Sequence, residues 1–186
     1  MANAEVALVR IDTRMVHGAV VSAWAKKCGT KRVVMVDDFL MKDPFMVNFY
    51  KKGKKRPVAI EVVDPVKAGE AWQAGTFVEQ YAKGHPVMVI AKDAQNLSAM
   101  WKAGFPLTEV NIGKNNYETG KHEITMTVFF NKEELGLLQE MVDAGVRVYV
   151  QVSPGDSPIE WDEVLRIYQE NKTSAPQLGA KKSTRE

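Results

Sequence analysis

Short apolar runs rich in β-branched residues recur along the chain, and the segments between them carry apolar residues at helical spacing. The runs at 33–36 and 87–90 are apolar throughout, as is typical of strands in a parallel sheet covered by helices on both faces. Between such runs, Leu135, Leu138 and Met141 fall on one side of a helix. The pattern predicts an α/β fold: a single-domain, mostly parallel, open twisted sheet of about seven strands with helices on both faces. The predicted strands are residues 6–9, 32–36, 58–62, 86–91, 109–112, 123–128 and 146–150.

Turn and capping residues support these boundaries. Gly29, Gly104 and Gly145 each stand just before a predicted strand, where a helix ends in a left-handed residue. Asp64 followed by proline is a typical helix start. The segment 114–121 contains turn formers and is too short for a crossover helix, so we expect one antiparallel pair between the fifth and sixth strands.

Composition narrows the class of protein. The 186 residues are 45% apolar and carry a formal net charge of only +2, which argues against a nucleic-acid binder. The single cysteine, Cys28, excludes an internal disulfide and favours a reducing compartment, so we expect a cytoplasmic protein. No apolar stretch has the length of a membrane span. We expect one domain over residues 1–170 and a flexible C-terminal tail over 171–186.

The segment after the first predicted strand carries the candidate chemistry. Arg10, Asp12, Arg14, His17 and Gly18 occur within nine residues, where a strand gives way to a helix and anions commonly bind. Two guanidinium groups can hold a phosphoryl group, a carboxylate can orient an imidazole, and glycine lets the backbone approach the ring. Transfer requires a neutral ring, so we expect a pKa near the ordinary histidine value. A surface ion-pair cluster around a capping histidine is the alternative.

The segment 9–20 resembles the R-I-D-x-R-L-I-H-G-Q-V motif of the IIB subunits of the mannose/fructose/sorbose family of the phosphoenolpyruvate-dependent sugar phosphotransferase system. The resemblance extends in order over roughly residues 5–165. It continues in 34–38 with 42–44, in 87–92, in 109–113, and in 146–154 after 138–145.

The resemblance implies a phosphotransferase, the IIB component of a protein-N-phosphohistidine–sugar phosphotransferase. His17 would accept a phosphoryl group from a IIA domain, on the ring nitrogen nearer the backbone, and pass it to a sugar imported by the IIC and IID membrane subunits. The chain would then lie in the cytoplasm, at the inner face of the membrane. Asp12 and Arg14 match the catalytic partners, Arg10 and Gly18 are expected to contact phosphate, and no metal or organic cofactor is implied.

Two departures from the motif leave a second function open. Thr13 and Ala19 replace the acidic residue and the glutamine that relatives usually carry. The alternative is a non-transporting regulatory module whose partner binding is switched by phosphorylation of His17. A third reading is an anion-binding domain without phosphotransfer. The sequence does not specify the sugar. A homodimer through Phe45, Phe49 and Tyr50 is one option, and packing of these side chains inward is the other.

Other polar features have a structural and a functional reading. Lys92 follows the fourth predicted strand and is either an outlying contact to the phosphate or a solvated lysine. Asp37 and Asp38 follow the second strand, and capping of the next helix is favoured over a metal site. The basic run 51–56 fits a solvated loop or a docking surface for an acidic partner or lipid headgroups. His85 and His122 are expected at the surface.

Overall fold

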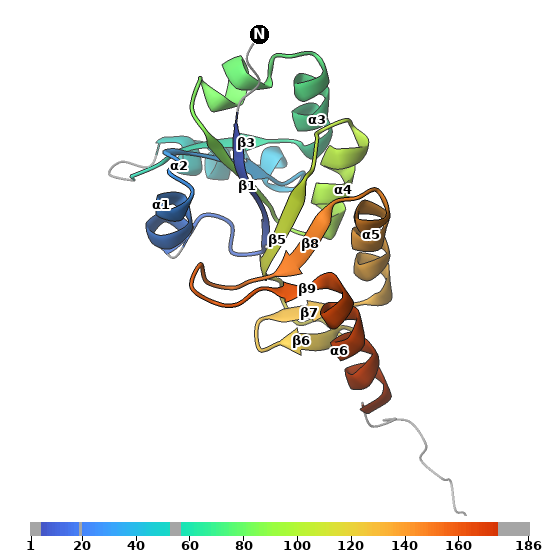
Figure 1. Ribbon diagram of the computed structural model, residues 1–186. Helices are drawn as coiled ribbons and strands as arrows, with labels where there is room; N and C mark the ends of the chain where they lie inside the picture. The colour runs from blue at the N-terminus through green and yellow to red at the C-terminus, as the bar shows by residue number, and fades with distance from the viewer. Residues whose placement is uncertain (1–4, 19, 53–56, 175–186) are drawn as a thin grey trace, which may run out of the picture.

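A mostly parallel, seven-stranded sheet runs through the centre of the protein (Figure 1). The computed structural model describes residues 5–18, 20–52 and 57–174. The strand order is β3-β2-β4-β1-β5-β8-β9, and all neighbours pair in parallel except the edge pair β8–β9. The predicted fold class is confirmed. The strands of this sheet are β1 (Val6–Asp12), β2 (Arg32–Val36), β3 (Ala59–Val63), β4 (Val87–Ala91), β5 (Glu109–Lys114), β8 (Arg147–Val150) and β9 (Ile159–Glu160).

The helices that connect the strands pack on both faces of the sheet. They include two π-helical segments, η1 and η3, and one 3₁₀ segment, η2. In chain order they are η1 (Val20–Trp24), α1 (Ala25–Lys27), η2 (Leu40–Lys42), α2 (Pro44–Lys52), α3 (Pro65–Gln73), η3 (Val78–Ala82), α4 (Ala94–Lys102), α5 (Lys132–Asp143) and α6 (Trp161–Ser174). None of the described helices is long and apolar enough to cross a membrane.

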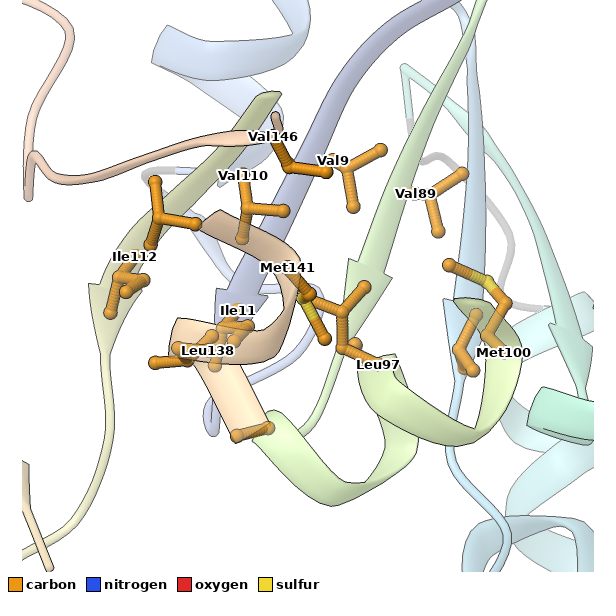
Figure 2. Packing of buried hydrophobic residues seen from close by; sticks show 14 of the residues in the cluster. Val9, Ile11, Val89, Leu97, Met100, Val110, Ile112, Leu138, Met141 and Val146 are labelled. Carbon is orange, nitrogen blue, oxygen red and sulfur yellow. The ribbon is translucent and has the colours of Figure 1, made fainter. Parts of the chain in front are cut away.

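Two hydrophobic cores lie on opposite sides of the sheet. Val9 and Ile11 of β1 face the core beneath α3, α4 and α5, and Figure 2 shows Leu97 of α4 and Leu138 of α5 gathered with Ile11. Leu8 faces the second core, beneath η1, α1 and α2. Because side chains alternate along a strand, the polar residues at positions 10 and 12 lie on the side of Leu8. Segment η1 therefore lies on the same face of the sheet as Arg10 and Asp12.

The predicted helix ends are confirmed at three glycines and one cap. Gly29, Gly104 and Gly145 have φ angles of 62°, 99° and 90°, in the left-handed region that glycine adopts without strain. The Asp64 carboxylate accepts hydrogen bonds from the backbone amides of Val66 and Lys67 at the start of α3.

The predicted strand 123–128 is confirmed only as far as Thr125, and its antiparallel pairing with the fifth strand is wrong. This segment forms a hairpin of β6 (His122–Thr125) and β7 (Val128–Phe130), which make a separate two-stranded antiparallel sheet. The turn at 126–127 contains no glycine, proline or asparagine, the residues that usually mark a chain reversal, and Met126 in it is 89% exposed. The alternation of apolar and polar residues therefore continues through the turn in the sequence. The antiparallel edge of the main sheet is β8–β9 instead.

The division into residues 1–170 and a flexible tail over 171–186 remains a prediction. Helix α6 continues to Ser174, and residues 175–186 lie outside the described residues.

Candidate functional site

The candidate loop begins at the centre of the sheet. Strand β1 lies between β4 and β5, and the chain builds strands β2 to β4 on one side of it before crossing to β5, β8 and β9 on the other. Such a reversal of strand order is where open α/β sheets bind ligands, beyond the carboxyl ends of the strands. Asp12 is the last residue of β1 and therefore stands at this position.

A tight turn follows β1 and presents the next residues of the motif. The amide of Met15 donates to the carbonyl of Asp12 at 2.8 Å. Met15 adopts a φ of 56°, which costs a residue with a side chain roughly 1–2 kcal/mol. Its side chain is only 5% exposed and packs in the second core. Burial of Met15 offsets the strained backbone and fixes the turn that carries Arg14.

Asp12 is a buried carboxylate held by two arginines. Arg14 grips both of its oxygens, with Nε 2.9 Å from Oδ1 and Nη2 2.8 Å from Oδ2. Arg10 donates to Oδ2 from Nε at 3.2 Å and from Nη2 at 2.9 Å. Burial alone would raise the pKa of the Asp12 carboxyl, but the hydrogen bonds and charges of the two arginines outweigh burial and lower it. Asp12 therefore stays ionised, and the three side chains carry one positive charge in excess.

His17 faces the same carboxylate with one ring nitrogen. Its Nε2 lies 3.5 Å from Oδ2 of Asp12, within ion-pair range but without hydrogen-bond geometry, and is shielded from solvent. The Nδ1 atom makes no hydrogen bond to any described residue, and the side chain is 22% exposed. Burial lowers the pKa of His17, the Asp12 charge opposes this effect, and the net shift is downward. The expectation of an ordinary pKa is thus corrected, and the ring is neutral at pH 7.

Arg10 does not lie in the loop, contrary to the sequence-based expectation. Strand β1 extends to Asp12, so Arg10 sits inside it with a fully buried side chain. Besides Asp12, its guanidinium donates to Oδ1 of Asn111, to the carbonyl of Gln151 at 3.0 Å and to that of Val152 at 3.1 Å. All five N–H donors of the guanidinium are thereby used. The predicted contact between Arg10 and phosphate remains a prediction, and in this structure no N–H donor of Arg10 is free to make it.

Three further residues complete the Arg10 environment, and the sequence-based reasoning did not find them. Asn111 of β5 is fully buried and donates through Nδ2 to the Gln151 carbonyl at 3.2 Å. A Cβ at Gly113 would overlap the Arg10 guanidinium, so this position requires glycine. The Trp24 ring lies 4.7 Å from Arg10 Cζ. A pairing between Arg10 and these residues has no local signal, because they are brought together only by strand pairing and helix packing.

The structure does not bring Lys92 into the cluster around Asp12. Its Nζ lies 3.5 Å from Oδ2 of Asp37 and 5.4 Å from the centre of the Phe39 ring. Among the described residues, it makes no hydrogen bond or ion pair with His17 or Asp12. Gly18 directly follows His17, and a Cβ there would meet no atom within 4 Å. The open space around Gly18 is compatible with an approach to its backbone, and its contact with phosphate remains a prediction.

The remaining polar features have structural partners or lie at the surface. The Asp37 carboxylate accepts from the amides of Phe39 and Leu40, which is the predicted cap. In the part of the chain that the structure describes, no cluster of three or more His, Cys, Asp or Glu side chains could hold a metal ion. Of the basic run 51–56, Lys51 and Lys52 are described at the end of α2 and 53–56 lie outside the described residues.

The remaining histidines and the aromatic residues of α2 lie at or near the surface. His85 is exposed, and His122 is half-buried with its ring against that of Tyr168. Phe45 and Phe49 are 77% and 54% exposed. The homodimer through Phe45, Phe49 and Tyr50 remains a prediction.

Fold and site together define a class of protein: an open α/β sheet that presents a neutral histidine, backed by a carboxylate and two arginines, at its carboxyl edge. This arrangement suits transient covalent phosphorylation of an imidazole.

Comparison with known proteins gives the family. Residues 6–176 match the family described as "PTS system sorbose subfamily IIB component", and the chain belongs to this family. It is a IIB phosphotransferase component of the phosphotransferase system, a phosphoryl carrier in sugar uptake. Membership implies IIA and IIC/IID partners.

Individual relatives agree with this assignment. The fructose-specific EIIB component of Bacillus subtilis (strain 168) is 22% identical, over 87% of this chain and 96% of the relative. The N-acetylgalactosamine-specific enzyme IIB component 1 of Escherichia coli (strain K12) is 26% identical, over 84% and 96%. The crystal structure of the IIBSor domain of the sorbose permease from Klebsiella pneumoniae superposes with a TM-score of 0.75 at 20% identity, over 87% of this chain and 96% of that one. The last comparison shows that the fold is shared.

Proposed function

We propose that His17 is the phosphorylated residue and that its Nδ1 atom accepts the phosphoryl group. The observation that carries this proposal is the orientation of the ring. Nε2 faces Oδ2 of Asp12 at 3.5 Å, whereas Nδ1 is without a partner among the described residues. A carboxylate acceptor next to Nε2 keeps the proton on that nitrogen and leaves the Nδ1 lone pair free to attack.

The transfer into the site then proceeds without a change of protonation on His17. The Nδ1 lone pair attacks the phosphorus of a phosphohistidine on the IIA partner, and the P–N bond to the donor breaks, returning its electron pair to the donor ring. The acceptor ring keeps its Nε2 proton and becomes cationic. Asp12, which stays ionised, stabilises this cation from 3.5 Å.

Arg14 is positioned to bind the phosphoryl oxygens. Its side chain is 35% exposed, unlike the fully buried Arg10. Two of its five N–H donors are used on Asp12, and the other three have no partner among the described residues. These donors and the excess positive charge of the cluster can neutralise the charge on the transferred group, which is the main requirement of phosphoryl transfer. Because Gly18 has no side chain, the oxygens of the phosphoryl group can approach its backbone.

In the second half of the cycle, a sugar hydroxyl attacks the phosphorus and releases its proton to solvent. The P–Nδ1 bond breaks with its electron pair returning to the ring, and His17 returns to its neutral form with the Nε2 proton in place. We place this step at the cytoplasmic face of the membrane, where IIC and IID subunits deliver the sugar. The sugars named for the relatives include fructose, sorbose and N-acetylgalactosamine, so we assign the substrate only as a sugar or amino sugar.

The test is phosphoryl transfer to the purified chain. Labelled phosphoenolpyruvate, the general phosphotransferase proteins and a IIA partner should give acid-labile label on the wild type. His17→Ala should abolish it, and His85→Ala and His122→Ala should retain it. Phosphorus–nitrogen coupling in the ¹⁵N-labelled protein should place the group on Nδ1. Label on the His17→Ala variant, or coupling to Nε2, would contradict the proposal.

A further inference from the structure

Arg10 and its partner Asp12 are both fully buried beside the proposed phosphoryl site. The Arg10 side chain is 0% exposed, and each of its N–H groups has an acceptor. A buried guanidinium with one carboxylate partner is costly to desolvate, so it has to be held by many hydrogen bonds. These bonds fix it in one orientation.

That orientation acts on one particular oxygen. Nε and Nη2 of Arg10 both donate to Oδ2 of Asp12, at 3.2 and 2.9 Å. Oδ2 is also the oxygen that lies 3.5 Å from Nε2 of His17. Arg14 also donates to Oδ2, at 2.8 Å, but from a partly exposed side chain, so the planar fork of the buried Arg10 is the rigid support of the oxygen that faces the imidazole.

The far side of the guanidinium is tied to elements distant in sequence. Nη1 donates to Asn111 of β5 and to the Gln151 carbonyl, and Nη2 to the Val152 carbonyl, in the segment that follows β8. Trp24 covers the flat face at 4.7 Å and donates from Nε1 to the Val152 carbonyl at 3.3 Å. Asn111 donates to the Gln151 carbonyl, which fixes which of its atoms accepts from Arg10. Arg10 is thus held from β5, η1 and the segment after β8 at once.

We infer that Arg10 is a positioning residue for phosphoryl transfer, which holds Oδ2 of Asp12 against Nε2 of His17 and so keeps the Nδ1 lone pair of His17 free. This inference rests on the proposed role of His17. Arg10 acts through Asp12 and makes no contact with the phosphoryl group. Asn111 and Gly113 contribute to the same positioning, because Asn111 accepts a hydrogen bond from Arg10 and Gly113 leaves room for its guanidinium.

The first measurement is the tautomer of the unphosphorylated ring. In the wild type, ¹⁵N chemical shifts of His17 should report the Nε2–H form. Arg10→Met, which keeps the length of the side chain and removes its donors, should let Asp12 turn and give a mixture of both tautomers. Arg10→Lys keeps the charge but not the fork, and should restore the ratio only in part. Arg166→Met, an exposed arginine of α6 paired with Glu163 and Glu170, is the control and should leave the ratio unchanged.

The second measurement is the rate of phosphoryl acceptance from a IIA partner. We expect Arg10→Met to lose about 10- to 100-fold, the penalty typical of a misplaced reacting group. The third is the ³¹P titration of the phosphorylated protein. Arg14→Met should shift the pKa of the phosphoryl group, and Arg10→Met should not, because only Arg14 has donors left to contact it.

Two results would overturn the inference. One is a wild-type tautomer ratio together with a rate within twofold of wild type in Arg10→Met. The other is a ³¹P shift in Arg10→Met as large as in Arg14→Met, which would show a direct phosphate contact. If Arg10→Met does not fold, Asn111→Ala replaces it, since this variant keeps the charge of Arg10 and removes one of its hydrogen-bond acceptors. A several-fold slower rate of acceptance with a mixture of tautomers would support the inference. No change in the rate or in the tautomer would contradict it. The tautomer of His17 is measured before phosphorylation. A wild type that takes up no label in the transfer assay would therefore refute the proposed role of His17, whereas the effect of Arg10 on the tautomer would still be tested on its own.

Discussion

Replacing Asp12 by asparagine tests the electrostatics of the site with the least change in shape. Asp12 and Arg10 are both 0% exposed and joined at 2.9 Å, so the substitution leaves an uncompensated positive charge in the interior. Removing one partner of a buried pair costs about 3–5 kcal/mol. Arg14 adds less, because its side chain is 35% exposed and can turn to water. We therefore expect Asp12→Asn to lower the free energy of unfolding at pH 7 by about 3–5 kcal/mol.

The sign of the pH dependence follows from the lowered pKa of Asp12. Burial opposes ionisation, but the arginine hydrogen bonds and charges prevail and lower the folded-state pKa below the ordinary aspartate value. As pH falls, the unfolded carboxyl takes up a proton before the folded one does. The stabilisation by Asp12 is therefore complete above the unfolded pKa of about 4 and is lost as pH falls through the lower folded pKa. Asparagine does not titrate, so the difference between wild type and variant should shrink in acid.

Urea unfolding followed by circular dichroism measures both quantities. With a slope of about 2 kcal/mol per molar urea, the midpoint at pH 7 should fall by about 1.5–2.5 M. Asp162→Asn, at an exposed position in the first turn of α6, is the matched control and should cost less than about 1 kcal/mol. A loss below 1 kcal/mol in Asp12→Asn, or a difference that stays constant from pH 7 to pH 3, would refute the account of Asp12 as a buried, arginine-held carboxylate.

Two further predictions concern the supporting backbone and the pH dependence of acceptance. Gly113→Ala should lower the free energy of unfolding by about 3–5 kcal/mol, because its Cβ would occupy the space of the Arg10 guanidinium and displace it from Asp12. The control is Gly136→Ala on the open face of α5, which should raise the free energy of unfolding by about 0.5–1 kcal/mol in the same thermal or urea unfolding assay. Equal effects of the two substitutions would contradict the crowding at position 113. The rate of acceptance by His17 should fall to half of its plateau only below the ordinary histidine pKa of about 6.5, since burial lowers the pKa of His17 and protonation blocks the nucleophile. An NMR titration of His17 with a midpoint at or above the ordinary histidine value would show this to be wrong.

The sequence determined the features that depend on nearby residues. Apolar runs and helical stripes gave the α/β class, because the periods of strand and helix differ. Gly29, Gly104 and Gly145 marked helix ends, since a left-handed residue there favours glycine whatever surrounds it. The motif from Arg10 to His17 indicated phosphoryl chemistry, because its charged residues lie within a few positions of one another.

Tertiary structure decided what each of those residues does. Strand β1 runs further than its apolar pattern shows, and this places Arg10 inside the sheet, where Asn111, Val152 and Trp24 reach it. The same applies to the hairpin of β6 and β7, whose pairing away from β5 depends on contacts that a local pattern does not contain. A sequence lists the charges near a histidine, but only packing fixes which are buried, because burial depends on segments far apart in the chain. For this protein, both arginines bind Asp12, but packing buries Arg10 completely and leaves Arg14 35% exposed, which is why we propose Arg14 as the phosphoryl contact.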